Sequence, residues 1–425
     1  MYRRSIQPML ATLILVIINI YFQFRTGIND PKFGDSQQYL LSARAIFNGE
    51  EYPRILEGWP FFRAPGYPFL VSTLWKISSY ESIVTLKLFN SICIGIMGLG
   101  IYLLARKNLS QKCAIAALVL STLNPFVFLQ SLEVSTESVT TTLFVLFIVL
   151  LTSKDFRAKG LFLGLINIAL IAIRPEFLFI STISVIIYYL FLEINPKKII
   201  IPILLIAVSI NFWGDENKRV TGDYIPLTNA TSFQLWLGST ETIYKNYPLR
   251  FQNSTNFSTA QYNQFVAEVD QVKKRYSFKE SVTDIPRQSN AWFTEYQNNV
   301  NKNKLEYLKN ILIKSTIFWR PFLNPSSYGL SLVLISLIIL LPFTVFSFLG
   351  YLIALRQKIF YREAIILFFC LGLLTIIHAL QMPDFRYRVP IQMPIMSLFI
   401  VFFFCNSRKW FRQERGSLNF HTQVK

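Results

Sequence analysis

The chain alternates between long apolar runs and short polar or basic clusters. Most apolar runs are about as long as a bilayer is thick, because a helical crossing needs roughly 20 mostly apolar residues. Three runs are shorter, so these helices either extend beyond the stated bounds or pack inside a bundle. Ten spans are predicted, at approximately residues 8–24, 82–105, 113–132, 138–153, 160–173, 177–192, 199–213, 329–355, 363–382 and 389–405. The pattern predicts an all-α polytopic membrane protein.

Two longer polar segments interrupt the apolar pattern. The first outer loop covers residues 25–81, and a second segment, 214–327, is expected to form a small α or α+β insert outside the membrane. Apolar residues recur at helical spacing from Asn290 to Trp319, which predicts one amphipathic helix lying at the interface. The chain is thus divided into an N-terminal membrane module (1–213), the insert (214–327), C-terminal spans (328–405) and a basic tail (406–425).

Composition and charge set the orientation of these spans. The 425 residues are 52% hydrophobic and 16% charged, which excludes a soluble protein, and 42 Lys and Arg against 24 Asp and Glu give a net charge of +18. Most of this excess lies in loops predicted on one side, and positive charge marks the cytoplasmic side. The prediction is a protein of the plasma (inner) membrane with both termini in the cytoplasm, and no nucleic-acid partner is expected. The basic loops are Arg106-Lys107, Lys154 to Lys159, Lys197-Lys198, Arg356 to Lys358 and Arg408-Lys409.

The first span is expected to be a retained signal anchor, because it carries no small-x-small cleavage site before Arg25. The four cysteines form no CxxC pair, so the sequence predicts neither a disulfide framework nor a zinc site. The sequence assigns no cofactor and leaves a divalent cation open. It also carries no nucleotide-binding loop and no sizeable cytoplasmic domain. A substrate donor is therefore expected to arrive within the membrane.

The first outer loop carries the strongest candidate for chemistry. Residues from Gly34 to Gly49 are predicted to form a short helix with Tyr39 on its apolar face and a glycine stop. Asp35 near its start, with Gln38 three residues on, fits a capping box. It also fits a carboxylate held just outside the membrane, where it would act as a general base on an acceptor hydroxyl. Both roles are compatible.

Two further segments place polar groups at outer turns. The stretch Arg63-Ala-Pro65-Gly66-Tyr67-Pro68 predicts a rigid turn leading into an apolar helix, and ordinary turn chemistry explains it. Glu133 and Glu137 lie between two spans. Glu137 either complements the N-terminus of the next helix or adds a second acid to the cavity of Asp35, since ionisable groups at membrane depth are functional candidates.

Three arginines lie in short turns predicted on the outer face. Arg174 belongs to Arg174-Pro175-Glu176, and Arg386, Tyr387 and Arg388 lie in the last outer turn. Headgroup snorkelling explains such arginines. The positive-inside bias disfavours them on this side, however, and the arginine fork suits phosphate oxygens. The sequence therefore predicts a lipid phosphate near these three side chains.

These motifs together resemble polytopic glycosyltransferases of the GT-C fold, in particular the protein O-mannosyltransferase and aminoarabinose-transferase group. The resemblance covers most of residues 1–213 and 290–400, and the insert matches weakly. Family members usually carry an Asp where Glu137 stands, and some have an acidic pair where only Asp35 stands. The motifs that carry the resemblance are Asp35 with Tyr39, Leu40, Ala43 and Gly49, then Arg63-x-Pro65-Gly66-Tyr67-Pro68, Ser-Thr-Glu137-Ser, Arg174-Pro-Glu and Arg386-Tyr387-Arg388-x-Pro390.

The resemblance implies a glycosyltransferase of the cell envelope that takes a sugar from a polyprenyl-phosphate carrier on the extracytoplasmic face. Transfer to a glycan, lipid or protein acceptor would invert the anomeric centre. Asp35 would be the general base, and Glu137 a second acid that orients the acceptor or assists Asp35. Arg174, Arg386 and Arg388 would stabilise the leaving lipid phosphate. The expected substrate cavity also includes Tyr39, Arg63, Tyr67, Glu133 and Tyr387.

Two other classes of protein share parts of this pattern. A polysaccharide polymerase or O-antigen ligase also has many spans and outer arginines, but usually carries its large loop late and lacks an acidic first-loop helix. A polysaccharide flippase or transporter is expected to show inverted repeats with polar groups near the midplane. The sequence shows no internal repeat, so the glycosyltransferase interpretation is preferred.

Overall fold

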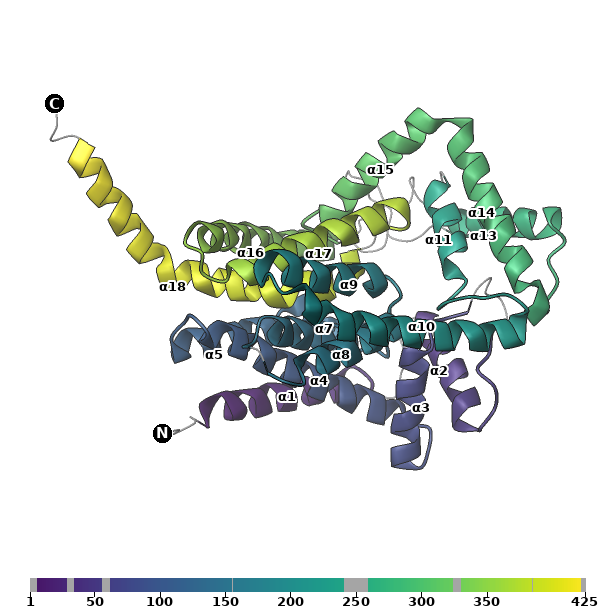
Figure 1. Ribbon diagram of the computed structural model, residues 1–425, viewed down its shortest axis with the longest axis horizontal. Helices are drawn as coiled ribbons and strands as arrows, with labels where there is room; N and C mark the ends of the chain where they lie inside the picture. The colour runs from purple at the N-terminus through teal and green to yellow at the C-terminus, as the bar shows by residue number, and fades with distance from the viewer. Residues whose placement is uncertain are drawn as a thin grey trace.

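The computed structural model describes residues 6–28, 34–55, 62–154, 156–240, 259–323, 330–383 and 385–421, and these residues are helical or in turns and loops, with no strand among them. Two groups of helices are visible in Figure 1. A long bundle holds most of the apolar helices, and shorter helices gather at one end of it. The start of α1 and the end of α18 both lie at the opposite end. The cytoplasmic location of both termini stays a prediction.

The bundle helices correspond to the predicted apolar runs. They are α1 (Gln7–Arg25), α4 (Ile83–Arg106), α5 (Gln111–Thr122) with α6 (Pro125–Ser131), α7 (Glu137–Leu151), α8 (Lys159–Ile173), α9 (Phe177–Ile187) with η1 (Tyr188–Leu192), η2 (Pro196–Ile199) with α10 (Ile200–Thr221), α16 (Leu330–Arg356), α17 (Tyr361–Leu380) and α18 (Val389–His421). Six spans among the described residues are long and apolar enough to cross a membrane, or seven if the bent pair α5–α6 counts as one span. The chain is therefore a multi-pass membrane protein. Helices α7, α8 and α9–η1 are shorter, so the count of ten crossings stays a prediction.

Burial separates central helices from peripheral ones. The apolar window of α18 is 72% buried and that of α4 is 61% buried, whereas the corresponding window of α10 is only 17% buried. The central helices pack through a continuous apolar core that includes Met97, Phe144 and Phe399. A peripheral helix that exposes apolar side chains in this way is expected to face lipid.

The predicted span 113–132 is bent by 55° between α5 and α6. Asn124 and Pro125 explain the break. The Asn124 side chain caps α6 by accepting hydrogen bonds from the backbone N–H groups of Phe126 (3.1 Å) and Val127 (3.4 Å). Pro125 occupies the first helical position, where no intrahelical N–H is needed.

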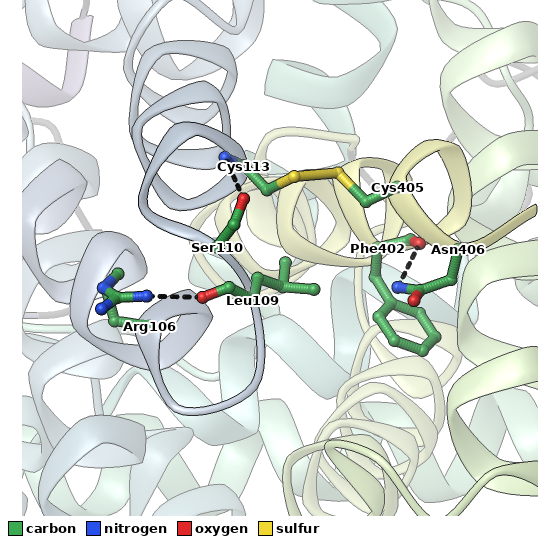
Figure 2. Close-up of a disulfide and its surroundings, with 7 residues drawn as sticks. All are labelled: Arg106, Leu109, Ser110, Cys113, Phe402, Cys405 and Asn406. Atoms are coloured by element: carbon green, nitrogen blue, oxygen red, sulfur yellow. Dashed lines mark hydrogen bonds between the residues drawn. A yellow bond between two sulfur atoms is a disulfide. The ribbon is translucent and has the colours of Figure 1, made fainter.

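The prediction that the cysteines form no disulfide is wrong for one pair. Cys113 and Cys405 are disulfide-bonded and join the start of α5 to α18 (Figure 2). Their separation of 292 residues gives no spacing signal in the sequence, because only the packing of α5 against α18 brings them together. Cys93 and Cys370 are free and buried.

The outer helices are α2 (Gly34–Phe47), α3 (Gly66–Ser78), α11 (Ala230–Ser239), α13 (Thr259–Arg275), η3 (Val282–Asp284), α14 (Ile285–Lys302), α15 (Lys304–Trp319) and η4 (Phe385–Tyr387). The predicted first-loop helix is confirmed as α2, and Gly49 follows it with φ +80°. The predicted turn at Pro65-Gly66 is confirmed as the start of α3.

Two expectations for the insert are corrected. The predicted boundary at 213/214 falls inside α10, which continues to Thr221. The single amphipathic helix expected from Asn290 to Trp319 is two helices, α14 and α15. They are separated at Asn303, whose side chain caps α15 by accepting a hydrogen bond from the backbone N–H of Glu306 (3.1 Å).

We expect Gly66→Ala to destabilise the fold near the first outer loop. A Cβ atom at Gly66 would lie 2.6 Å from the carbonyl carbon of Ala172, so α3 would have to move away from α8. Overpacking of this kind costs about 1–3 kcal/mol. Thermal unfolding of the purified protein in detergent, followed by tryptophan fluorescence, measures the change. The matched control is Gly372→Ala, where a Cβ meets nothing within 4 Å. Equal midpoints for the two variants would contradict the prediction.

Candidate functional site

A cavity of about 370 Å³ lies where the outer helices meet the bundle. Its walls come from the start of α2, the turn before α3, the start of α7, the α8–α9 turn, α11 and the end of α17. It combines polar groups, aromatic rings and apolar side chains. The residues that line it are Asp35, Tyr39, Phe62, Arg63, Ala64, Gln130, Ser135, Thr136, Glu137, Ile173, Arg174, Pro175, Glu176, Phe179, Thr228, Ala230, Thr231, Gln234, Leu235, Ile377, His378, Leu380, Gln381, Met382, Arg386 and Tyr387.

Asp35 lies in the first turn of α2 between two arginines. Arg63 Nη2 donates to Asp35 Oδ1 and Arg386 Nη2 donates to Asp35 Oδ2, both at 2.8 Å. Arg63 Nε also donates to Gln38, so the glutamine expected in a capping box instead orients an arginine. Burial raises the pKa of Asp35, but Arg386 and Arg63 outweigh it and hold the pKa below its ordinary value of 3.8. Asp35 is therefore a carboxylate at neutral pH.

A second ion pair lies deeper in the same cavity. Arg174 follows the last residue of α8, and its Nη2 donates to Glu137 Oε1 at 2.9 Å. Both side chains are buried, with 8% and 7% of their surface exposed. Arg174 also donates to Thr136 Oγ1 at 3.0 Å and lies 3.5 Å from Glu176. Two carboxylates thus surround this one arginine.

Tyr387 connects the two ion pairs. Its ring stacks on His378 with centroids 4.3 Å apart and 9° between the planes. The guanidinium carbons of Arg386 and Arg174 lie 5.0 Å and 5.4 Å from the Tyr387 ring centroid. Cation–π contacts of this length hold a guanidinium plane against the ring. Tyr387 therefore positions both arginines.

The structure brings together seven of the ten residues predicted for the site, namely Asp35, Tyr39, Arg63, Glu137, Arg174, Arg386 and Tyr387. The other three do not line the cavity. Tyr67 is buried behind Tyr39, with ring centroids 5.0 Å apart. The backbone carbonyl of Glu133 accepts a hydrogen bond from Asn90. The Arg388 guanidinium is buried and donates to the backbone carbonyl of Arg320 at 2.6 Å.

Sequence reasoning missed two groups of cavity residues. His378 is one of only two histidines in the chain and lies in the last turn of an apolar helix, which is a usable signal for a functional group. The polar edge of α11, with Thr231 and Gln234, gave no signal because the insert carries no recognised motif. No group of three or more His, Cys, Asp or Glu side chains within the described residues is placed to hold a metal ion.

The fold and cavity define a multi-pass membrane protein with a charged site at the end of the bundle opposite its termini. Among solved structures, it is similar to an oligosaccharyltransferase from Archaeoglobus fulgidus in its apo form, at 13% identity and a TM-score of 0.54. The alignment covers 98% of this chain and 52% of that one. A complex of the same organism's oligosaccharyltransferase AglB with an inhibitory peptide and a dolichol-phosphate aligns at 12% identity and a TM-score of 0.48, with the same coverage of each chain.

This chain thus spans about half the length of the structures it matches. At this identity, the likeness to the apo enzyme shows a shared fold, and it supports the GT-C fold expected from the motifs. It does not distinguish the subgroup. No protein-family model and no curated protein sequence matches the chain.

We expect Glu137→Gln to lower the thermal stability of the protein. The change leaves Arg174 buried with only Glu176 as a carboxylate partner, and breaking a buried ion pair costs up to about 3–5 kcal/mol. The double variant Glu137→Gln/Arg174→Gln is expected to recover part of the loss, because it removes the uncompensated charge. Thermal unfolding in detergent measures all three proteins.

The matched control is Glu81→Gln, which breaks an exposed pair with Arg44 (2.7 Å) and is expected to cost at most about 1 kcal/mol. Similar small losses for Glu137→Gln and Glu81→Gln would show that the pair with Arg174 does not stabilise the cavity.

Proposed function

We propose that the protein is a membrane glycosyltransferase that moves a sugar from a polyprenyl-phosphate carrier to an acceptor hydroxyl on the extracytoplasmic face. The acceptor would be a glycan, a lipid or a protein. The observation that carries the proposal is the Asp35 carboxylate bonded to Arg63 and Arg386 inside one cavity. Transfer at an anomeric carbon needs a base on one side and anion stabilisation on the other, and this cavity offers both.

The proposed reaction is a single displacement with inversion. Asp35 accepts the proton of the acceptor hydroxyl as its oxygen attacks the anomeric carbon. The bond from that carbon to the phosphate oxygen breaks, and its electron pair leaves with the lipid phosphate. Arg386 stabilises the charge that develops on the phosphate. The products are the glycosylated acceptor and a polyprenyl phosphate, and the proton leaves from Asp35 afterwards.

Before substrate binds, Arg386 also controls how strong a base Asp35 is. Both oxygens of Asp35 are bonded to arginine, so the carboxylate is a weak base until one of them leaves. A donor phosphate competes for Arg386, whose side chain is 31% exposed. Its withdrawal frees Oδ2 to take the acceptor proton. Arg63 stays behind to keep Asp35 oriented.

We assign the deeper ion pair, Arg174 with Glu137, to substrate binding. Arg174 is held by Glu137 and Glu176, so it offers donors without a net positive charge. Glu137 would fix Arg174 and orient the acceptor. Arg388 is left out of the proposed phosphate site because its guanidinium is bonded to a backbone carbonyl away from the cavity.

The cavity also has an apolar side that suits a lipid-linked donor. Phe179 of α9 lines it and is 57% exposed on a helix of the membrane bundle. Ile173 and Ile377 also line the cavity. A polyprenyl chain would leave the cavity there into surrounding lipid, where apolar burial favours it.

We expect Asp35→Asn to reduce transfer by about 10²–10⁴-fold, the usual contribution of a general base. The assay measures polyprenyl phosphate released from a mixed pool of polyprenyl-phosphate sugars, with native membrane lipids and glycans as acceptors. The matched control is Asp215→Asn, an exposed acid on α10 outside the cavity, which is expected to keep wild-type activity. Equal release by wild type and Asp35→Asn would remove Asp35 as the base. No release by wild type with any acceptor would favour the polymerase, ligase or transporter interpretations.

We expect the acid limb of the wild-type kcat/KM profile, which reports the free enzyme, to lie below about pH 4, because Arg386 and Arg63 keep the pKa of Asp35 below 3.8 in spite of burial. The ionised carboxylate is the active form, so activity falls as pH drops through this pKa. Arg386→Gln keeps Asp35 buried but removes one of its two arginine partners, so the acid limb is expected to move to higher pH. The control Arg44→Gln, at an exposed position, is expected to leave it unchanged. A limb that stays in place in Arg386→Gln would contradict the assignment.

A further inference from the structure

Lys314 of α15 is a buried lysine whose partners are backbone carbonyls. Its side chain lies in the wall between the insert and the bundle, and the residue is 1% exposed. The Nζ atom donates to the carbonyl oxygen of Gly238 at 2.6 Å, of Gln381 at 3.4 Å and of Leu380 at 3.5 Å. An ammonium has three N–H donors, so all three can be used.

These carbonyls belong to the ends of two helices. Gly238 lies in the last turn of α11, while Leu380 ends α17 and Gln381 caps it. The last carbonyls of a helix have no intrahelical partner, and they form the negative end of the helix dipole. Lys314 therefore supplies donors and positive charge to two helix C-termini at once.

The two helix ends are in direct backbone contact at this point. A Cβ atom at Gly238 would lie 2.2 Å from the carbonyl oxygen of Leu380 and 2.5 Å from that of Gln381. Two carbonyl-rich helix ends at this distance repel each other without N–H donors between them. Lys314 provides those donors.

Both helices form walls of the cavity. Thr231 and Gln234 face it from α11, and His378 and Gln381 face it from α17. We propose that Lys314 is a positioning residue that holds the C-terminal ends of α11 and α17 together and thereby sets the width of the cavity. The cavity wall formed by α11 then lies at a fixed distance from Arg174 and Arg386. This role concerns the cavity itself and rests on the proposed function only for its kinetic test.

The charge of Lys314 is sensitive to pH near neutrality. Burial lowers its pKa from the ordinary 10.5 to about 7. The helices around Lys314 differ in their titratable groups. Helix α11 has none. On α17, His378 stacks on the end of α15, and on α14, Tyr296 shares a hydrogen bond with Tyr307 of α15. The single acid in the first turn of α15, Glu306, is exposed. A solvated lysine titrates near 10.5, so between about pH 7 and 10.5 opening the contact requires the amine to take up a proton. The contact therefore becomes harder to open as pH rises above about 7.

The first test is hydrogen–deuterium exchange of the full-length protein in lipid nanodiscs, read at α11 and the last turn of α17. Lys314→Met keeps the chain length and removes the donors, and it is expected to raise exchange about tenfold in these two segments alone. Lys309→Met, at an exposed position of the same helix, is the control and is expected to match wild type. Gly238→Ala forces the two backbones apart and is expected to give the same local pattern.

The pH dependence of exchange tests whether the ionisation of Lys314 controls the contact. Wild-type exchange in α11, corrected for the intrinsic rate, is expected to fall above about pH 7, because opening then requires Lys314 to take up a proton. Lys314→Arg keeps its charge throughout this range and is expected to lose this dependence. Unchanged local exchange in both Lys314→Met and Gly238→Ala would overturn the proposal. If Lys314→Met unfolds globally, Gly238→Ala and the wild-type pH dependence decide, and a flat result in both overturns it.

The kinetic arm uses the release assay described above. Lys314→Met is expected to raise the KM for the acceptor about tenfold with a much smaller change in kcat, because it shifts a binding wall and leaves Asp35 in place. Equal losses in kcat and KM, or none, would count against the positioning role. Raised local exchange together with a wild-type protein that releases nothing would leave the role of Lys314 standing and overturn the proposed function instead.

Discussion

The structure depends on one carboxylate held between two arginines from distant parts of the chain. Asp35 and Arg386 are 351 residues apart, and their contact closes the first outer loop against the last outer turn. A charge in a weakly hydrated site at a membrane surface is costly unless it is paired. The contact therefore joins two walls of the cavity that lie far apart in the sequence, and Tyr387 helps to hold Arg386 there.

The sequence was sufficient for features that depend on local pattern. The apolar runs, the short helix ending before Gly49 and the turn at Pro65 all follow from periodicity, glycine and proline, and the structure confirms them. It also supplied most of the charged residues of the cavity, because charged groups at outer turns are unusual enough to notice. It did not supply their partners. That Glu137 pairs with Arg174, and that Arg388 turns away from the cavity, depends on packing between helices that no spacing rule encodes.

The insert illustrates the same limit. Its helices pack through aromatic side chains around Trp292, and the contact of Gly238 with the end of α17 joins the insert to the bundle. Neither residue stands in a motif, and the break at Asn303 is a single capping side chain inside an otherwise continuous amphipathic pattern. The shared fold with an archaeal oligosaccharyltransferase covers about half of that protein, so the comparison locates a common scaffold and leaves substrate choice to the cavity walls.

Helix α10 has a mechanical consequence of its own. It runs without a break from the bundle to Thr221 among the outer helices (Figure 1). Asn217 near its end accepts a hydrogen bond from Arg54 of the first outer loop and donates one to the carbonyl of Ile225. A helix this exposed to lipid adjusts its tilt to the thickness of the surrounding bilayer. Because its outer end is bonded to the first outer loop, a change of tilt moves that loop. The lipid composition of the membrane is thus expected to act on the position of the first outer loop.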